Sequence, residues 1–173
     1  MKLHIFKSFE ALDGARLMEI YREGNEENAD ELYPDIADRT AARERVEREF
    51  LNYLKTDFFS RGGREYWVLE DGGVWVCALR LYLVHSGLYY IEALETRPEY
   101  RRRGYAAELL NRMTDELKRG GAFRLCDCVS KRNIASLNTH FKCGFKIAAE
   151  EGFSYLTGET NDRTYGLELE FLG

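Results

Sequence analysis

The segment that most constrains the architecture is Arg97-Pro98-Glu99-Tyr100-Arg101-Arg102-Arg103-Gly104-Tyr105-Ala106. An apolar run over residues 88–94, rich in aromatic and β-branched side chains, precedes it and predicts a strand. Apolar residues then recur at helical spacing over residues 106–117. Pro98 ends the strand pattern because it has no amide hydrogen for a ladder, and Gly104 admits the chain to the helix without a Cβ. The segment is therefore expected to form a basic loop between a strand and a helix N-terminus.

Such a loop has two interpretations. The first amides of a helix have no partner and lie at the positive end of its dipole, so they can hold a diphosphate flanked by Arg101, Arg102 and Arg103. Alternatively, the segment is an ordinary strand-to-helix turn with three solvated arginines. The P-loop pattern and the dinucleotide pattern G-x-G-x-x-G are both absent.

Composition restricts the class of protein. A chain of 173 residues, 45% apolar and 32% charged, is typical of one soluble globular domain. It contains no apolar stretch long enough to span a bilayer, and residues 1–7 lack the core of a signal peptide, so we expect a cytoplasmic protein. Four cysteines without metal-ligand spacing and three histidines predict reduced, buried thiols and no metal site.

The formal charge of −5 is concentrated near the N-terminus, where residues 1–60 hold 14 acidic and 9 basic side chains. Between Glu19 and Asp38, eight acidic residues face only Arg22. This acidic segment is either a wall that attracts a cationic substrate or a solvated surface loop. The overall balance argues against a nucleic-acid-binding protein.

The remaining patterns predict one α/β domain with a mixed sheet of about six to seven strands and about four helices. Helices are expected after a Ser8 cap, from Thr40, over 104–119 and from Asn133 to Gly144, with a loop or short helical turn over 24–38. A strand–helix–strand crossover should make strand 123–129 parallel to strand 88–96. The expected strands are 3–6, 66–69, 74–84, 88–96, 123–129, 145–148 and 164–171.

A second motif lies downstream: Asn133-Ile134-Ala135-Ser136-Leu137-Asn138-Thr139-His140-Phe141-Lys142-Cys143-Gly144-Phe145. It resembles the segment N-x-x-[SA]-x-x-x-[YH]-x-K-x-G-F of the GNAT superfamily of acetyl-CoA-dependent N-acetyltransferases. The pattern Arg101-x-x-Gly104-x-Ala106 resembles the R/Q-x-x-G-x-G/A loop of the same superfamily. Asn133 as a helix cap and Gly144 as a stop need no function, but that account leaves His140 unexplained.

The resemblance, which covers roughly residues 65–150, implies a GNAT-like fold with a mostly antiparallel sheet. It implies a single domain over 1–173, with substrate-side helices in 1–64, an acyl-CoA-binding core in 65–150 and a closing strand in 151–173. Acetyl-CoA is the implied co-substrate, and Arg101, Arg102 or Lys131 is the implied partner of its 3′-phosphate. The implied cofactor-binding residues are Leu94, Glu95, Thr96, Arg101, Arg102, Arg103, Gly104, Tyr105, Ala106, Asn133 and Ser136.

The implied reaction is direct attack of a primary amine on the acetyl thioester. His140 stands where many family members have a tyrosine that protonates the thiolate, and imidazole can do this near neutral pH. Glu92 is the expected general base, because a carboxylate within an apolar strand costs stability unless it is used or paired. Pairing of Glu92 with an arginine, Glu95 as the base and a water chain are alternatives.

The acceptor is open at this point. A small cationic amine is expected, whereas a protein N-terminus or lysine is one alternative and a non-catalytic acyl-CoA sensor is another. No nucleic-acid or membrane partner is expected, and a homodimer through the last strands is compatible with the fold.

Overall fold

The computed structural model describes residues Met1–Gly173. Seven strands form one sheet in the order β1-β2-β3-β4-β5-β9-β6, and β7 with β8 forms a separate two-stranded sheet. The strands are β1 (Lys2–Phe6), β2 (Arg64–Asp71), β3 (Val74–His85), β4 (Leu88–Thr96), β5 (Phe123–Ser130), β6 (Lys146–Ala149), β7 (Gly152–Phe153), β8 (Thr160–Asn161) and β9 (Thr164–Phe171). The helices are α1 (Gly14–Ile20), α2 (Arg22–Leu32), α3 (Arg39–Tyr53), α4 (Tyr105–Arg119) and α5 (Ile134–Lys142), with a π-helical turn η1 (Leu54–Phe58) and a 3₁₀ turn η2 (Pro98–Tyr100).

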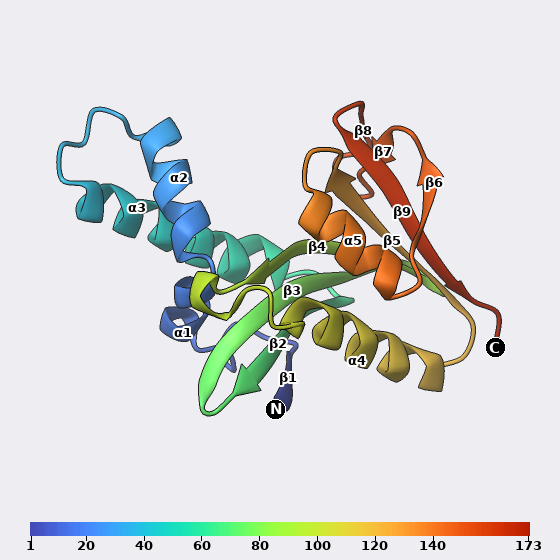
Figure 1. The fold of residues 1–173 in the computed structure, drawn as a ribbon. Helices are drawn as coiled ribbons and strands as arrows, with labels where there is room; N and C mark the ends of the chain where they lie inside the picture. Colours follow the sequence, from blue (N-terminus) through green and yellow to red (C-terminus); the bar gives the residue numbers. More distant parts are fainter.

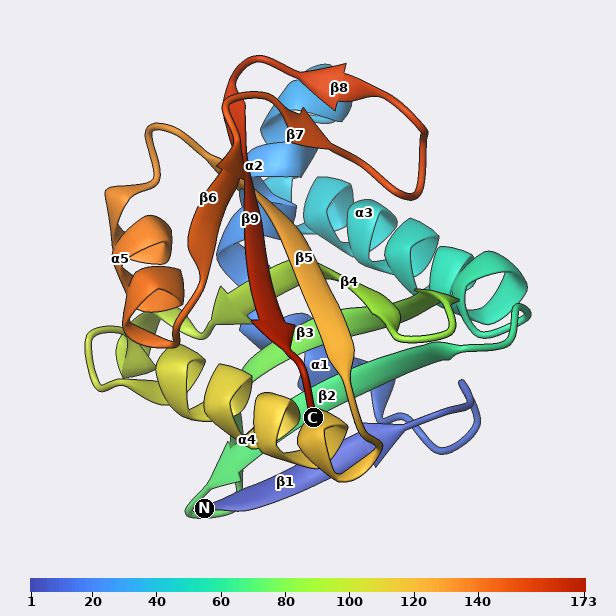
Figure 2. The same ribbon diagram turned by 90° about the vertical axis from the view of Figure 1, so that its right-hand side faces the viewer.

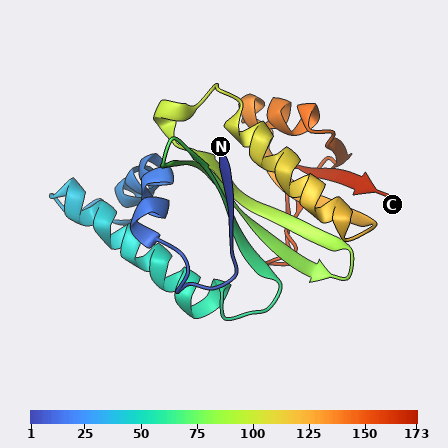
Figure 3. The ribbon, with the colours of Figure 1, turned by 90° about the horizontal axis from the view of Figure 1, so that it is seen from below.

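The helices cover the sheet on two sides. Figure 3 shows α1, α2 and α3 on one side of the curved sheet and α4 and α5 on the other, and Figure 1 gives the labels. Leu109, Leu110 and Met113 of α4 are fully buried in the larger hydrophobic core, and Leu17 of α1 and Phe58 of η1 are fully buried in the second. Each such side chain contributes roughly 1.5–3 kcal/mol by leaving water.

The mixed sheet predicted from the crossover is confirmed. β4 and β5 pair in parallel, and every other pairing in the sheet is antiparallel. The parallel pairing extends only from Leu88 to Tyr90 of β4, although β4 continues to Thr96. In Figure 2, β4 and β5 run in clearly different directions. The later half of β4 therefore has no strand partner on its β5 side.

A backbone irregularity lies in this half of β4. Ala93 has φ 54°, and the register between β3 and β4 shifts between Ala78 and Arg80. A non-glycine residue in the left-handed region is uncommon and persists only when its surroundings hold it there. The Tyr21 hydroxyl provides such a restraint, because it donates to the Ala93 carbonyl oxygen at 2.6 Å.

The prediction of a loop or short helical turn over residues 24–38 was wrong, since α2, a helix of 11 residues, occupies most of it. Ion pairs that the local sequence does not show stabilise this helix: Arg43 of α3 pairs with Glu26 at 3.2 Å, and Arg39 pairs with Asp30. The Ser8 cap was also wrong, because α1 begins at Gly14, where Asp13 accepts a hydrogen bond from the Arg16 amide at 3.1 Å. No helix is both long and apolar enough to cross a membrane.

Candidate active site

The N-terminus of α4 is open to an anion. Gly104 caps the helix with φ 83°, and no side chain accepts a hydrogen bond from the first helical amides. A Cβ placed on Gly104 would meet no atom within 4 Å. Arg102 also has a positive φ, 60°, so two residues of the loop take the left-handed conformation. The loop thus presents unpartnered amides beside free space, which is what a diphosphate requires.

A groove of about 740 Å³ runs from this loop to α5. The structure brings ten of the expected cofactor-binding residues together along it: Leu94, Glu95, Thr96, Arg101, Arg102, Gly104, Tyr105, Ala106, Asn133 and Ser136. Arg103 does not line the groove, and its guanidinium lies over the Tyr100 ring at 5.3 Å. The groove also takes in Thr139 and Lys142, which occupy the same motif as Asn133 but were not expected as site residues.

Asn133 and Ser136 are held by the start of α5. The Asn133 side chain caps the helix by accepting a hydrogen bond from the Ser136 amide at 3.0 Å. On the opposite wall, Leu94, Glu95 and Thr96 belong to the part of β4 that lacks a partner on its β5 side. Main-chain groups there can pair with an extended amide-containing arm as an added strand would. The uncapped amides and the unpaired strand edge together fit the diphosphate and the pantetheine arm of coenzyme A.

The basic side chains near the groove differ in their partners. Arg101 is engaged by two carboxylates, Glu95 at 3.1 Å and Glu23. Arg102 lines the groove and has no ion pair, so its guanidinium remains available to a phosphate. Lys131 lies outside the groove lining, over the Tyr165 ring at 4.9 Å and 3.9 Å from Glu150.

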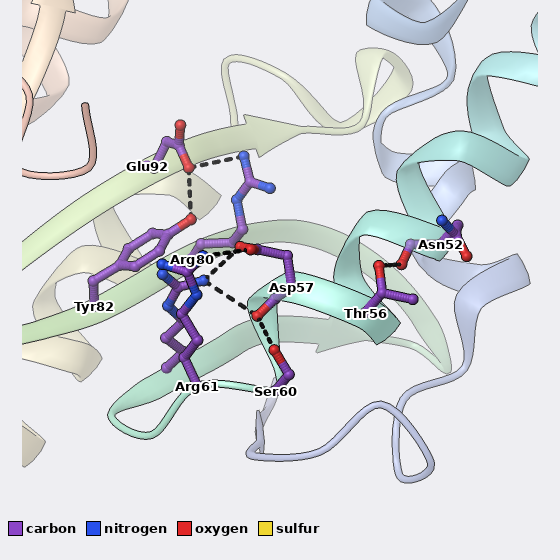
Figure 4. Close-up of polar contacts among 9 residues, drawn as sticks. Asn52, Thr56, Asp57, Ser60, Arg61, Arg80, Tyr82 and Glu92 are labelled. Atoms are coloured by element: carbon purple, nitrogen blue, oxygen red, sulfur yellow. Dashed lines mark hydrogen bonds and ion pairs between the residues drawn. The ribbon is translucent and has the colours of Figure 1, made fainter.

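Glu92, the expected base, is already paired. Its carboxylate lies 2.9 Å from the Arg80 guanidinium and accepts a hydrogen bond from the Tyr82 hydroxyl at 2.8 Å (Figure 4). Arg80 in turn packs against Phe50 and Phe58, with its guanidinium 5.5 and 5.9 Å from the two ring centres. Glu92 does not line the groove. Both contacts are made by Oε2, and they stabilise the ionised carboxylate, which makes Glu92 a weaker base.

Glu95 is the carboxylate that lines the groove. Burial raises its pKa above the usual value for glutamate, and the Arg101 guanidinium and the Thr96 amide oppose this shift. The Thr96 amide donates to Glu95 Oε1 at 3.1 Å. A carboxylate with a raised pKa is a stronger base than an ordinary one, so Glu95 is better suited to take a proton from an ammonium group.

His140, the expected acid, is fully buried and lies outside the groove lining. Its Nδ1 is 2.8 Å from the Ser136 carbonyl oxygen, and its Nε2 is 2.9 Å from Asp127 Oδ2. Burial alone lowers the pKa of His140, but the Asp127 carboxylate and the Ser136 carbonyl outweigh it and raise the pKa above the usual value. Both ring nitrogens are therefore occupied. Asp127 was not identified from the sequence, since it interrupts an otherwise apolar strand without a motif.

No group of three or more His, Cys, Asp and Glu side chains is arranged to hold a metal ion. No curated protein sequence matches the chain. Among solved structures, PaiA N-acetyltransferase from Thermoplasma acidophilum in complex with coenzyme A is 19% identical with a TM-score of 0.65, covering 99% of this chain and 100% of the other. IAA acetyltransferase from Bacillus cereus is 16% identical with a TM-score of 0.61, covering 98% and 100%. Aminoglycoside 6′-acetyltransferase type Ii is 15% identical with a TM-score of 0.62, covering 100% and 99%.

At these identities the likeness shows a shared fold. The family is shown by a sequence model, described as the acetyltransferase (GNAT) family, which matches residues 16–145. That match includes β4, the basic loop, α4 and α5, the elements that line the groove. The chain therefore belongs to the acetyltransferase (GNAT) family and is an acetyl-CoA-dependent acyltransferase.

Proposed function

We propose that this protein transfers the acetyl group of acetyl-CoA to a primary amine of a small cationic molecule. The observation that carries the proposal is the groove, in which the uncapped α4 N-terminus and the unpaired edge of β4 lie on one path. Residues 101–106 hold the diphosphate, and the main chain of Leu94, Glu95 and Thr96 pairs with the pantetheine arm. Asn133 and Ser136 contact the arm from α5, and Arg102 is the guanidinium free to meet a phosphate.

In the proposed reaction, the acceptor ammonium first loses a proton to Glu95. The free amine then attacks the thioester carbonyl carbon, a C–N bond forms and the C–S bond breaks. The attacking nitrogen loses its extra proton and the departing thiolate takes one up, so the products are the N-acetyl amide and the free thiol of coenzyme A. Because both nitrogens of His140 are engaged, we assign this residue to holding α5 on β5 rather than to that last transfer.

Two observations favour a cationic small molecule as the acceptor. Glu27, Glu31 and Asp35 of the acidic segment have no ion pair, so the segment keeps a negative charge that can attract a cation. Most of its other carboxylates are paired with arginines of this chain. Aminoglycoside 6′-acetyltransferase, which shares the fold, is named for a polycationic acceptor. The four free cysteines fit a reducing compartment such as the cytoplasm.

One observation favours the non-catalytic alternative, an acyl-CoA sensor: Glu92, Glu95 and His140 all have partners already. Thiol release from acetyl-CoA separates the two functions. We expect release with spermidine or an aminoglycoside, and little with a peptide that has a free N-terminus. A thermal shift with acetyl-CoA but no thiol release on any amine would support the sensor, and release on the peptide alone would identify a protein acceptor.

A further inference from the structure

The Arg101 side chain of the basic loop is paired with α2. Its Nη2 contacts Glu23 of α2 and lies 3.1 Å from Glu95 Oε1, while its Nε donates to the Thr96 carbonyl oxygen at 3.2 Å. A second pair runs beside it, since Arg97 Nη2 lies 3.3 Å from Glu19 Oε2. Glu19 of α1 and Glu23 of α2 are four residues apart in sequence, as are Arg97 and Arg101. Two ion pairs thus join the α1–α2 region to the segment that follows β4.

These contacts occupy groups that the cofactor needs. Arg101 and Thr96 both line the groove, and the Thr96 carbonyl belongs to the unpaired edge of β4. A guanidinium binds phosphate through the same N–H donors that it offers to carboxylates. Nη2 takes part in either bidentate arrangement of a guanidinium with a phosphate, so a phosphate that binds Arg101 in this way must displace Glu23 and Glu95 from Nη2. An arm that pairs with the Thr96 carbonyl competes with the Arg101 Nε for that oxygen.

We propose that Glu23 is a positioning residue for the cofactor site: it holds Arg101 Nη2 in a contact that competes with bidentate binding of a phosphate of acetyl-CoA. The contact weakens cofactor affinity and links occupation of the groove to release of α2. This inference rests on the cofactor site of the proposed function. It predicts that removing the charged side chain of Glu23 increases, rather than decreases, the affinity for the cofactor.

The expected effect is modest because the pair is partly exposed, with 40% of the Arg101 and 47% of the Glu23 side chain accessible. Because exposed ion pairs contribute little free energy, we expect a roughly two- to fivefold change in the affinity for coenzyme A. Removing any carboxylate nearby also lessens repulsion of the phosphates. Glu27, one turn further along α2, is exposed and has no ion pair, so Glu27→Gln is the matched control for that general effect.

The test is titration of the full-length protein with coenzyme A by calorimetry, without an acceptor. We expect Glu23→Gln to bind two- to fivefold more tightly than the wild type, and Glu27→Gln to bind as the wild type does. In an Arg101→Gln background the Glu23→Gln effect should vanish, because its partner is gone. Thermal unfolding without ligand should show that Glu23→Gln is no more stable than the wild type.

Unchanged or weaker binding by Glu23→Gln would overturn the inference, and so would equal tightening by Glu27→Gln or persistence of the effect without Arg101. Each of these results leaves the cofactor site standing, because the wild type still binds coenzyme A. A wild type that does not bind coenzyme A would overturn the proposed function and this inference together.

Discussion

His140 and Asp127 form a buried ion pair whose proton positions follow from their partners. Nδ1 faces the Ser136 carbonyl oxygen, which can only accept, so Nδ1 carries a hydrogen. Nε2 faces the Asp127 carboxylate, which accepts when it is ionised, so both ring nitrogens carry a hydrogen and the ring is charged opposite the ionised carboxylate. Neither nitrogen then offers a lone pair to a substrate. The geometry gives this pair a structural role between α5 and β5.

We predict that Asp127→Asn destabilises the protein by about 3–5 kcal/mol at pH 6, because it leaves a buried imidazolium without its counter-ion. A raised histidine pKa stabilises the folded state fully below the unfolded value of about 6.5, and that contribution is lost as the pH rises through the folded pKa. The difference between the wild type and Asp127→Asn should therefore shrink at pH 9. Urea unfolding at both pH values measures it.

The exposed and unpaired Asp162 provides the control for this change in charge. Asp162→Asn should leave the unfolding free energy within about 0.5 kcal/mol of the wild type at both pH values. A difference for Asp127→Asn that does not depend on pH would mean that His140 is neutral in the folded protein.

Glu95 and Glu92 give a matched comparison of two carboxylates on one strand. We predict that Glu95→Gln lowers kcat by about 100-fold, as expected for loss of a general base, while KM for acetyl-CoA changes by less than about fivefold. Because the pKa of Glu95 is raised, the acid limb of the wild-type pH–rate profile should lie above the usual glutamate range and disappear in Glu95→Gln. Glu92→Gln should keep that limb, and movement of the limb in Glu92→Gln instead would restore Glu92 as the base.

The basic loop and the α4 N-terminus form one end of the groove together, and Gly104 is the residue that joins them. We predict that Gly104→Glu weakens coenzyme A binding at least tenfold, because the side chain brings a carboxylate into the groove at the place of the diphosphate. The positive φ adds a backbone cost of roughly 1–2 kcal/mol. Calorimetric titration with coenzyme A measures the change in affinity.

Gly158, between β7 and β8, separates the two effects. It also has a positive φ and open space at the Cβ position, but it lies outside the groove. Gly158→Glu should lose similar stability and bind coenzyme A as the wild type does. Equal loss of binding in both variants would show that the effect comes from backbone strain and not from the site.

The elements predicted correctly from the sequence are those whose pattern is local. α4 has apolar residues at helical spacing and a glycine before it, and the β4–α4–β5 crossover has a preferred hand, so both could be derived from residues 88–129 alone. α2 was not predicted, and part of what holds it lies outside its own segment: Arg39 and Arg43 of α3 pair with Asp30 and Glu26.

The same reasoning applies to the groove. The residues gathered by the two motifs were predicted, since a motif is contiguous in sequence. The partners that change their chemistry were not: Glu23 lies 78 positions from Arg101, and Asp127 is 13 from His140. Pairs between residues so far apart in sequence form only where the fold brings their elements together, and a local pattern does not show where that happens.

For the whole molecule, the groove lies where β4, α4 and α5 meet. β4 and α4 form one wall and α5 forms the other, and the unpaired edge of β4 lies beside them. A ligand that fills the groove should therefore stabilise the fold as a unit. At a coenzyme A concentration 100 times its Kd, binding to the folded state alone contributes about 2.7 kcal/mol.

For a chain of this length, that stabilisation corresponds to a rise in Tm of roughly 5–10 °C, measured by scanning calorimetry with and without coenzyme A. Amide hydrogen exchange should slow at residues 94–96 and 105–107, because those main-chain groups gain partners, while amides of β1 change little below the global unfolding limit. Gly104→Glu serves as the control: with tenfold weaker binding, the same ligand concentration contributes only about 1.4 kcal/mol, so the rise in Tm should be about half as large. A rise in Tm without protection at residues 94–96 would place the pantetheine arm away from the β4 edge, whereas protection there alone would place the diphosphate away from α4.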